Sequence, residues 1–168
     1  MAQNKTYTVK YRRKQEGKTD YKQRRKLIDS GKVRITVRRM LNSITVQFIE
    51  FVPKGDKVLT SVCSKELAKD YGWTGHGGNI ASAYLVGYLC GLKSKVKIGV
   101  LDIGLASPIK GSAFFAAARG LIDAKINVSC SEKVMPSMDR IERKGLKPET
   151  FSKHFEETKK KIEAKWKK

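Results

Sequence analysis

Acidic side chains are scarce in this chain of 168 residues: 16 Asp and Glu stand against 36 Lys and Arg, a formal net charge of +20. Such an excess repels itself unless a polyanion offsets it, and nucleic acid is the commonest such partner. Long apolar runs are also absent, since no stretch approaches the roughly 20 residues needed to span a bilayer. The first residues, MAQNKTYTVKYRRK, lack the apolar segment of a signal peptide. We therefore expect a cytoplasmic protein with no membrane partner.

Cysteine and histidine are rare too, and their spacing excludes several kinds of site. Cys63, Cys90 and Cys130 form no C-x-x-C pair and have no histidine cluster near them, so we expect neither a metal site nor a cofactor. They are typical of free thiols in a reducing compartment. His76 and His154 have no evident Ser or Cys partner, which leaves a nucleophilic triad unsupported.

The positive charge is concentrated at the two ends of the chain. Residues 5–26 hold ten basic and two acidic side chains, and residues 140–168 hold eleven and five. The 113 residues between them hold fifteen and nine. This layout predicts a basic N-terminal arm over 1–18 without helix or strand, a core over 19–130, and a C-terminal extension over 131–168.

The first half of the core has the pattern of strands. Thr19 or Asp20 can cap a helix over about 20–30, which Gly31 ends. VRITVRR (33–39) alternates apolar with polar residues, so one face is apolar and the other cationic. Strands over 44–52 and 57–63 follow, joined by a turn at 53–56, and together these predict an antiparallel meander.

The second half of the core alternates helices with one strand. Ser64 can cap a short helix ended by Gly72, Asn79 can cap a buried helix, and Ser112 begins another. Between the last two, 97–104 reads as a fully apolar strand of a covered sheet. The sequence therefore predicts an α/β fold in which helices pack on a mixed sheet, an antiparallel meander plus a parallel strand.

A basic amphipathic helix is expected at the C-terminus, with Pro148 in its first turn. Phe151, Phe155, Ile162 and Trp166 share one broad face of it. We expect this face to dock on RNA or on a neighbouring protein.

Three motifs suggest other chemistry. Gly17-Lys18-Thr19 matches the end of a Walker loop, but Arg12 occupies the first glycine position and no strand precedes it. The loop GWTGHGGN (72–79) is either a turn that lets a helix pack closely or an RNA phosphate contact at a helix N-terminus. Asp102 ends an apolar strand, where a metal-dependent nuclease places a carboxylate, but few acids can converge on it. We expect Asp102 to accept hydrogen bonds from loop amides.

The basic segments remain as the candidate site. Lys and Arg neutralise phosphates, while tyrosine can stack on a base or bond a 2′-hydroxyl. The predicted RNA-binding residues are Lys10, Tyr11, Arg12, Arg13, Lys14, Lys18, Thr19, Tyr21, Lys22, Arg24, Arg25, Lys32, Arg34, Arg38 and Arg39. Candidate contact loops add Trp73, His76, Asn79 and Lys110.

Three segments resemble one known family. TDYKQRRKLIDSGKVRITVRR, YGWTGHGGNIASAYLVGYLCGL and LDIGLASPIKGSAFFAAARGLIDA are similar, in this order, to the archaeal form of ribosomal protein L-eighteen of the large subunit. The resemblance covers roughly residues 10–140. It implies a ribonuclease-H-like topology without that enzyme's activity, and binding to 5S rRNA in the central protuberance. It also implies contacts with 23S-type large-subunit rRNA, ribosomal protein L-five and other central-protuberance proteins, with no small-molecule substrate.

The sequence thus predicts a structural RNA-binding protein of the large ribosomal subunit, not an enzyme. Two alternatives stay open at this stage. One is a metal-dependent RNA-processing nuclease on the same topology. The other is an RNA chaperone without a fixed target.

Overall fold

The computed structural model describes residues 8–143 and 150–166, and a single mixed sheet organises them. Its strands are β1 (Val33–Arg39), β2 (Ile44–Glu50), β3 (Lys57–Cys63), β4 (Ile98–Asp102) and β5 (Asn127–Val128), in the order β3-β2-β1-β4-β5. The first three form the expected antiparallel meander, and β4 runs parallel to β1. The mixed α/β sheet is therefore confirmed. Strand β5 was not expected, because two residues are too few to show a period.

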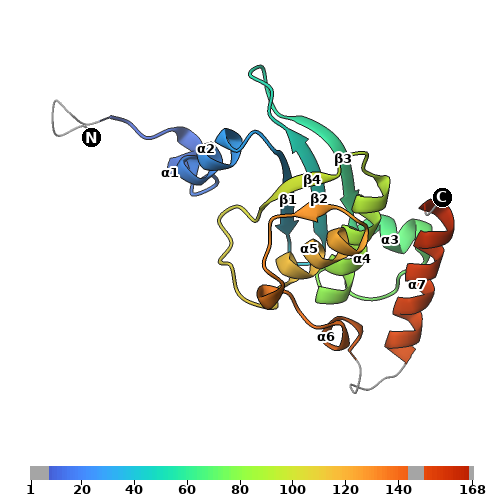
Figure 1. Cartoon of the computed structure of the whole chain (residues 1–168). Helices are drawn as coiled ribbons and strands as arrows, with labels where there is room; N and C mark the ends of the chain where they lie inside the picture. The colour runs from blue at the N-terminus through green and yellow to red at the C-terminus, as the bar shows by residue number, and fades with distance from the viewer. Residues whose placement is uncertain (1–7, 144–149, 167–168) are drawn as a thin grey trace.

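Two helices, α4 (Ile80–Lys93) and α5 (Ala113–Asp123), pack against each other and against the sheet (Figure 1). Asn79 Oδ1 accepts a hydrogen bond of 2.7 Å from the Ser82 amide, which confirms the predicted cap of α4. Glycines allow the two helix backbones to touch. A Cβ at Gly87 would lie 2.2 Å from the Ala117 carbonyl oxygen, and one at Gly120 would lie 2.2 Å from the Tyr84 carbonyl oxygen.

The N-terminal arm contains structure that its sequence did not predict. Residues 1–18 were expected to lack helix, but Arg12–Gln15 form a single turn, α1. The helix expected over about 20–30 is α2 (Tyr21–Asp29), whose N-cap Asp20 accepts from the Lys22 amide at 2.9 Å. Gly31 has a φ of 65°, the left-handed conformation that ends such a helix at low cost.

One helix begins a residue earlier than expected. Helix α3 (Ser64–Tyr71) takes Cys63 as its N-cap residue, and the Cys63 amide donates to Glu66 Oε1 at 3.1 Å. Ser64 is not the cap, because its hydroxyl accepts a hydrogen bond from the Ile44 amide of β2 instead. Gly72 ends the helix in the left-handed conformation, as predicted.

The three cysteines are all described, and none is paired with another. Cys90 lies buried in α4, and its thiol donates to the Val46 carbonyl. Burial raises the pKa of the Cys90 thiol to about 12, so the group is protonated and unreactive at neutral pH.

The C-terminal helix α7 (Thr150–Trp166) packs on the protein's own core. The short helix α6 (Met138–Glu142) precedes it, after a 3-10 turn at Glu132–Val134, while Pro148 lies outside the described residues. Phe155 and Ile162 are fully buried, and the Tyr88 hydroxyl donates to Glu163 at 2.7 Å. Contrary to the expectation, Phe155 and Ile162 are therefore covered by the protein itself, through α3 and α4, and cannot dock on another molecule. Trp166 at the end of the same face stays 37% exposed.

Substitution Ile162→Val tests the burial of α7. Deleting one buried methyl group is expected to lower the free energy of unfolding by about 0.5–1.5 kcal/mol. Chemical denaturation of the free protein measures the change. A loss below about 0.3 kcal/mol would mean that α7 does not pack on the core in solution.

Candidate nucleic-acid interface

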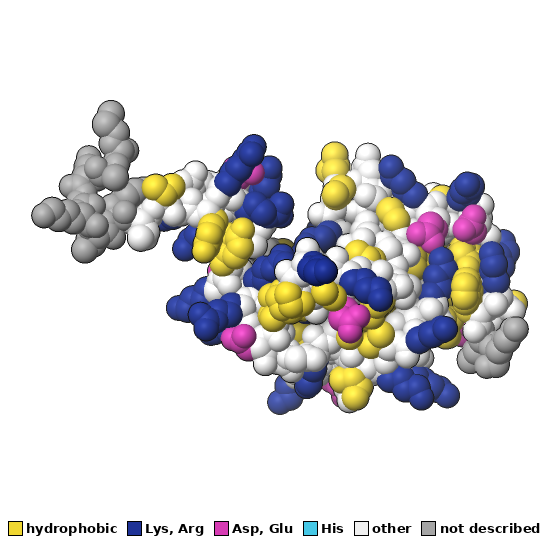
Figure 2. All heavy atoms as spheres, turned by 90° about the horizontal axis from the view of Figure 1, so that it is seen from above, with side chains coloured by type: hydrophobic (Ala, Val, Ile, Leu, Met, Phe, Trp, Pro, Cys, Tyr) yellow, Lys and Arg dark blue, Asp and Glu magenta, His cyan; other side chains and the backbone are white. Residues whose placement is uncertain are grey.

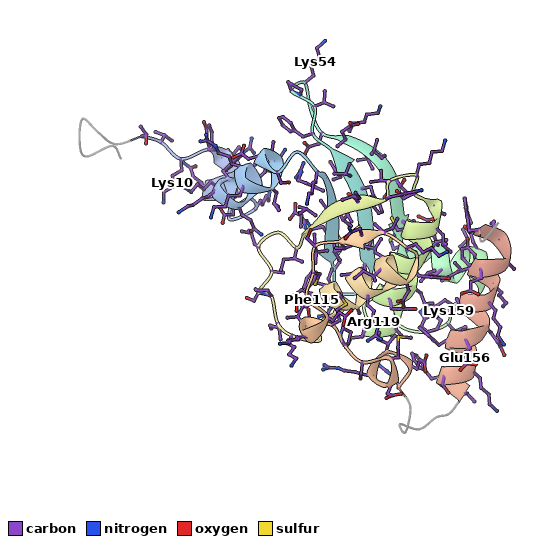
Figure 3. The ribbon with its side chains drawn as sticks, viewed as in Figure 1. Lys10, Lys54, Phe115, Arg119, Glu156 and Lys159 are labelled. Atoms are coloured by element: carbon purple, nitrogen blue, oxygen red, sulfur yellow. The ribbon has the colours of Figure 1, made fainter. Side chains whose placement is uncertain are left out.

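Exposed cations gather on the arm and on α2. The side chain of Arg12 is 90% exposed and that of Arg25 is 84% exposed, while Lys10, Lys14, Lys22 and Lys32 are also exposed. Figure 2 shows Lys and Arg side chains prominent on the arm, with few Asp or Glu among them. Figure 3 places Lys10 on the arm and Lys54 at the tip of the turn between β2 and β3, both away from α7. Exposed cations thus cover the arm and the β2–β3 turn, and others, such as Lys160 and Lys161, lie on α7.

The arm is held in shape by its own side chains. Arg13 Nε donates to Thr19 Oγ1 at 3.0 Å, and the rings of Tyr11 and Tyr21 lie 5.1 Å apart. Hydrogen bonds from Lys18 and then Arg12 lower the pKa of Glu16 below its usual value. Tyr11 remains 71% exposed, so its ring is available for stacking on a base.

One carboxylate joins α2 to the sheet. Asp56, in the turn between β2 and β3, lies 2.7 Å from Arg24 of α2 and 2.7 Å from Arg34 of β1. Arg24 is separated from Asp56 by 32 positions, so no local pattern could have revealed the pair. Sequence analysis treated Asp56 as a turn residue, and its role in orienting the cationic helix was missed.

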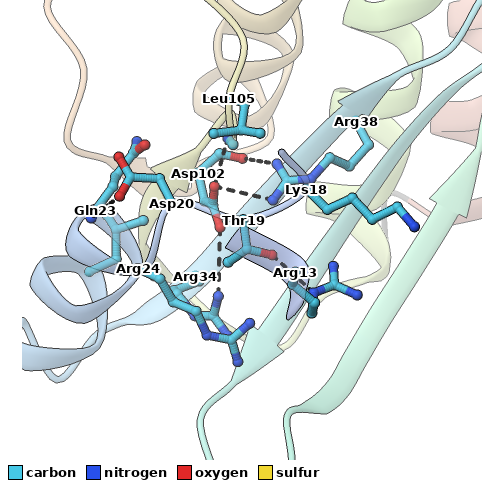
Figure 4. Close-up of a pocket in the computed structure, with 12 residues that line it drawn as sticks. Arg13, Lys18, Thr19, Asp20, Gln23, Arg24, Arg34, Arg38, Asp102 and Leu105 are labelled. Atoms are coloured by element: carbon cyan, nitrogen blue, oxygen red, sulfur yellow. Dashed lines mark hydrogen bonds and ion pairs between the residues drawn. The ribbon is translucent and has the colours of Figure 1, made fainter. Parts of the chain in front are cut away.

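Arg34 does not lie on an exposed cationic face, contrary to the prediction. The residue is 3% exposed, and its guanidinium lies between Asp56 and Asp102, with Nη1 3.6 Å from Asp102 Oδ2. Segment 13–27 covers this end of the strand, and Figure 4 shows the small hollow that remains beside Arg13, Thr19 and Arg24. Thr36 on the same face is also buried. Arg34 is therefore a buried cation whose ion pairs hold α2 and the β2–β3 turn against the sheet.

Asp102 is a structural acceptor, as expected. Its Oδ1 accepts from the Gly104 amide at 2.8 Å and from Arg38 Nη2 at 3.2 Å (Figure 4). Arg38 also donates to the Asp102 carbonyl at 2.8 Å, yet 44% of its side chain stays exposed. Arg39, exposed at the end of β1, donates from Nε to the Gly78 carbonyl at 3.2 Å. These contacts hold both arginines at the surface in fixed directions.

The glycine-rich loop is partly a core element. Trp73 is 3% exposed, stacks on His154 with ring centroids 5.3 Å apart, and donates from Nε1 to Ser82 Oγ at 2.8 Å. The prediction of Trp73 as an RNA-contact residue is wrong in its premise, because the ring is not at the surface. His76 is exposed, with Nε2 3.2 Å from Asn42 Oδ1, and Lys110 is exposed as well.

In the described part of the chain, no helix is both long and apolar enough to cross a membrane. Nor do three or more His, Cys, Asp or Glu residues come together there as a metal-binding group.

Comparison with known proteins decides the family. Residues 5–100 match the model of the ribosomal large subunit proteins 60S L5 and 50S L18. This chain belongs to that family. The large ribosomal subunit protein uL18 of Methanobrevibacter smithii is 40% identical to it over 190 residues, covering 97% of this chain and 98% of the relative. The uL18 protein of Caldivirga maquilingensis is 39% identical over 196 residues, covering 99% and 95%.

Membership of the L5/L18 family makes the chain a protein of the large ribosomal subunit and not an enzyme. The predicted resemblance to archaeal L-eighteen is confirmed over nearly the whole length, including the C-terminal residues beyond the three quoted segments. The nuclease alternative is wrong. The carboxylate on which it depended, Asp102, is instead engaged by two arginines and a loop amide.

Proposed function

We propose that this L18-family chain binds 5S rRNA and helps to anchor it in the central protuberance. Large-subunit rRNA, ribosomal protein L-five and other proteins of that region would be its further partners. The observation that carries the proposal is the exposed cationic segment α1–α2, which Asp56 and Arg34 hold on the sheet in one orientation. Cations that are held in fixed positions can match the phosphate spacing of one folded RNA, whereas freely mobile cations would fit many different RNAs.

The family resemblance supports a finer description of the fold. We propose that the order β3-β2-β1-β4-β5, with its antiparallel meander and parallel β4, represents the ribonuclease-H-like topology. We also propose that 1–18 and 131–168 serve as basic extensions of a core at 19–130, although α7 packs back on that core.

Among the predicted RNA contacts, the exposed ones are the strongest candidates. These are Lys10, Tyr11, Arg12, Arg13, Lys14, Lys18, Lys22, Arg25, Lys32, Arg38 and Arg39. Arg24 and Tyr21 are half-buried and hold the segment together, so we assign them a supporting part.

The variant Arg12→Ala with Arg25→Ala tests the proposal. Each lost phosphate contact removes up to about 0.9 from the slope of log affinity against log salt concentration, so the double variant should lose up to about 1.8. Filter binding of purified protein to 5S rRNA at several salt concentrations measures this slope.

The matched control is Lys69→Ala with Lys160→Ala, which removes the same charge from exposed sites on α3 and α7. It should leave the slope nearly unchanged. An unaltered slope in the Arg12 and Arg25 variant would place those side chains in solvent. Equal affinity of the unmodified protein for 5S rRNA and for unrelated RNAs at moderate salt would favour the chaperone alternative instead.

A further inference from the structure

A second hollow, of about 370 Å³, lies where α4 and α5 begin. Asn79, Ile80 and Ala81 line it from the start of α4, and Ser112 and Ala113 line it from the start of α5. The two helices lie side by side, so their N-termini face the same space. Each N-terminus carries amides without a carbonyl partner in its own helix and the positive end of the helix dipole.

The walls of the hollow add cationic side chains and no acid. Arg39 at the end of β1, Lys110, and Arg140 and Arg143 of the α6 segment all line it. None of the described residues in its lining carries a carboxylate, and Asp139 and Glu142 of α6 lie outside that lining. A Cβ at Gly111 would come within 2.8 Å of Arg140 Nη1, so this guanidinium is held close to the start of α5.

Ser112 shows that the start of α5 is incompletely satisfied. It occupies the N-cap position, but its side chain makes no capping hydrogen bond. Its hydroxyl oxygen is buried and has no hydrogen-bond partner in the described part of the chain. No side chain caps α5, so its first amides are left available to acceptor oxygens in the hollow.

We propose that this hollow, the α4–α5 pocket, binds one phosphate group of the 5S rRNA backbone. The inference rests on the proposed 5S rRNA function and assigns a specific site to it. Arg39 connects the two, since it belongs to the predicted RNA surface and also lines the pocket. Guanidinium groups and helix amides can both donate hydrogen bonds to the oxygens of a tetrahedral anion, and the guanidinium groups also supply positive charge.

Variant Lys110→Gln with Arg140→Gln removes two of the pocket's charges from exposed residues. Ethylation interference on 5S rRNA, with full-length protein at fixed salt, identifies the phosphates that binding requires. We expect one phosphate, or a short run, to stop interfering in the variant, and the affinity to fall about tenfold. The control is Lys69→Gln with Lys160→Gln, which should keep the interference pattern.

Variant Ala113→Pro tests the helix amides without changing charge. Ala113 is the first residue of α5, where proline is tolerated, and Ser112 before it has φ −75° and ψ 169°, which proline permits. In this variant, ethylation of the same phosphate as in the Lys110 and Arg140 variant should no longer interfere with binding. Circular dichroism and thermal unfolding verify that each variant is folded.

Three outcomes separate the sources of the anion. Loss of the same interference in both variants supports the proposal. An unchanged interference pattern in the folded Lys110 and Arg140 variant overturns the proposal. This holds even if inorganic phosphate, at matched ionic strength, raises the unfolding temperature of the unmodified protein. The pocket would then bind free phosphate and not a phosphate of the RNA. Failure of the unmodified protein to prefer 5S rRNA over unrelated RNA overturns the proposed function itself.

Discussion

Substitution Asp102→Ala is expected to lower the free energy of unfolding by about 3 kcal/mol. Removing one partner of a buried ion pair typically costs 3–5 kcal/mol, because the other charge is left buried and uncompensated. We expect the lower end of that range, since Asp56 remains 2.7 Å from Arg34. The Gly104 amide and Arg38 would lose their acceptor at the same time. Urea denaturation followed by circular dichroism measures the change.

The matched control for this prediction is Asp29→Ala. Asp29 is paired with Arg25 at 3.8 Å on the exposed face of α2, so its removal should cost less than about 1 kcal/mol. The double variant Arg34→Met with Asp102→Leu should be more stable than Asp102→Ala. It replaces the buried ion pair by an apolar pair of similar volume, so that neither charge has to be desolvated. Similar costs for Asp102→Ala and Asp29→Ala would show that the buried network contributes nothing to stability.

Substitution Gly87→Ala is expected to cost about 3 kcal/mol, the upper end of the range for overpacking a core. The added Cβ would meet the Ala117 carbonyl oxygen at 2.2 Å, and an alanine has no rotamer that relieves a contact with backbone. The higher helix propensity of alanine returns only about 1 kcal/mol. Chemical denaturation and the retention of near-ultraviolet circular dichroism measure the outcome.

Gly120→Ala should behave in the same way, since its Cβ would meet the Tyr84 carbonyl oxygen across the same contact. The two changes share one interface, so their costs should not add. The control is Lys69→Ala on the exposed face of α3, expected within about 0.5 kcal/mol of the unmodified protein. If the Gly87 and Gly120 variants were as stable as the Lys69 control, α4 and α5 could move apart without a loss of folding free energy.

The elements of the core were predictable because their signals are local. The strand β1, the Asn79 cap and the left-handed Gly72 each follow from a few adjacent residues, and all three are confirmed, although the burial along β1 does not alternate as its sequence does. Helix α1 and strand β5 were missed because four and two residues are too short to establish a period. Contacts over long separations were missed for another reason: nothing near Asp56 in the sequence indicates Arg24 or Arg34.

The same limit governs the candidate site. Composition placed the cations on the arm and the first strand, and the exposure of Arg12 and Arg25 agrees with that. Which strand residue is covered depends on where α2 lies, so the local pattern predicts a surface position for Arg34 although the residue is buried. Trp73 was misjudged similarly, because the ring packs on His154 and Phe155 from a helix that follows it by about 80 positions.

The aromatic contacts of α7 also determine what an optical experiment on this protein would observe. Both tryptophans of the chain lie at that helix: Trp73 packs beneath it, and Trp166 donates to the Tyr71 hydroxyl at 2.8 Å. Intrinsic tryptophan fluorescence would therefore report the detachment of α7. Rearrangement of the arm would leave that tryptophan signal unchanged, because the described aromatic rings of the arm, Tyr11 and Tyr21, are tyrosines.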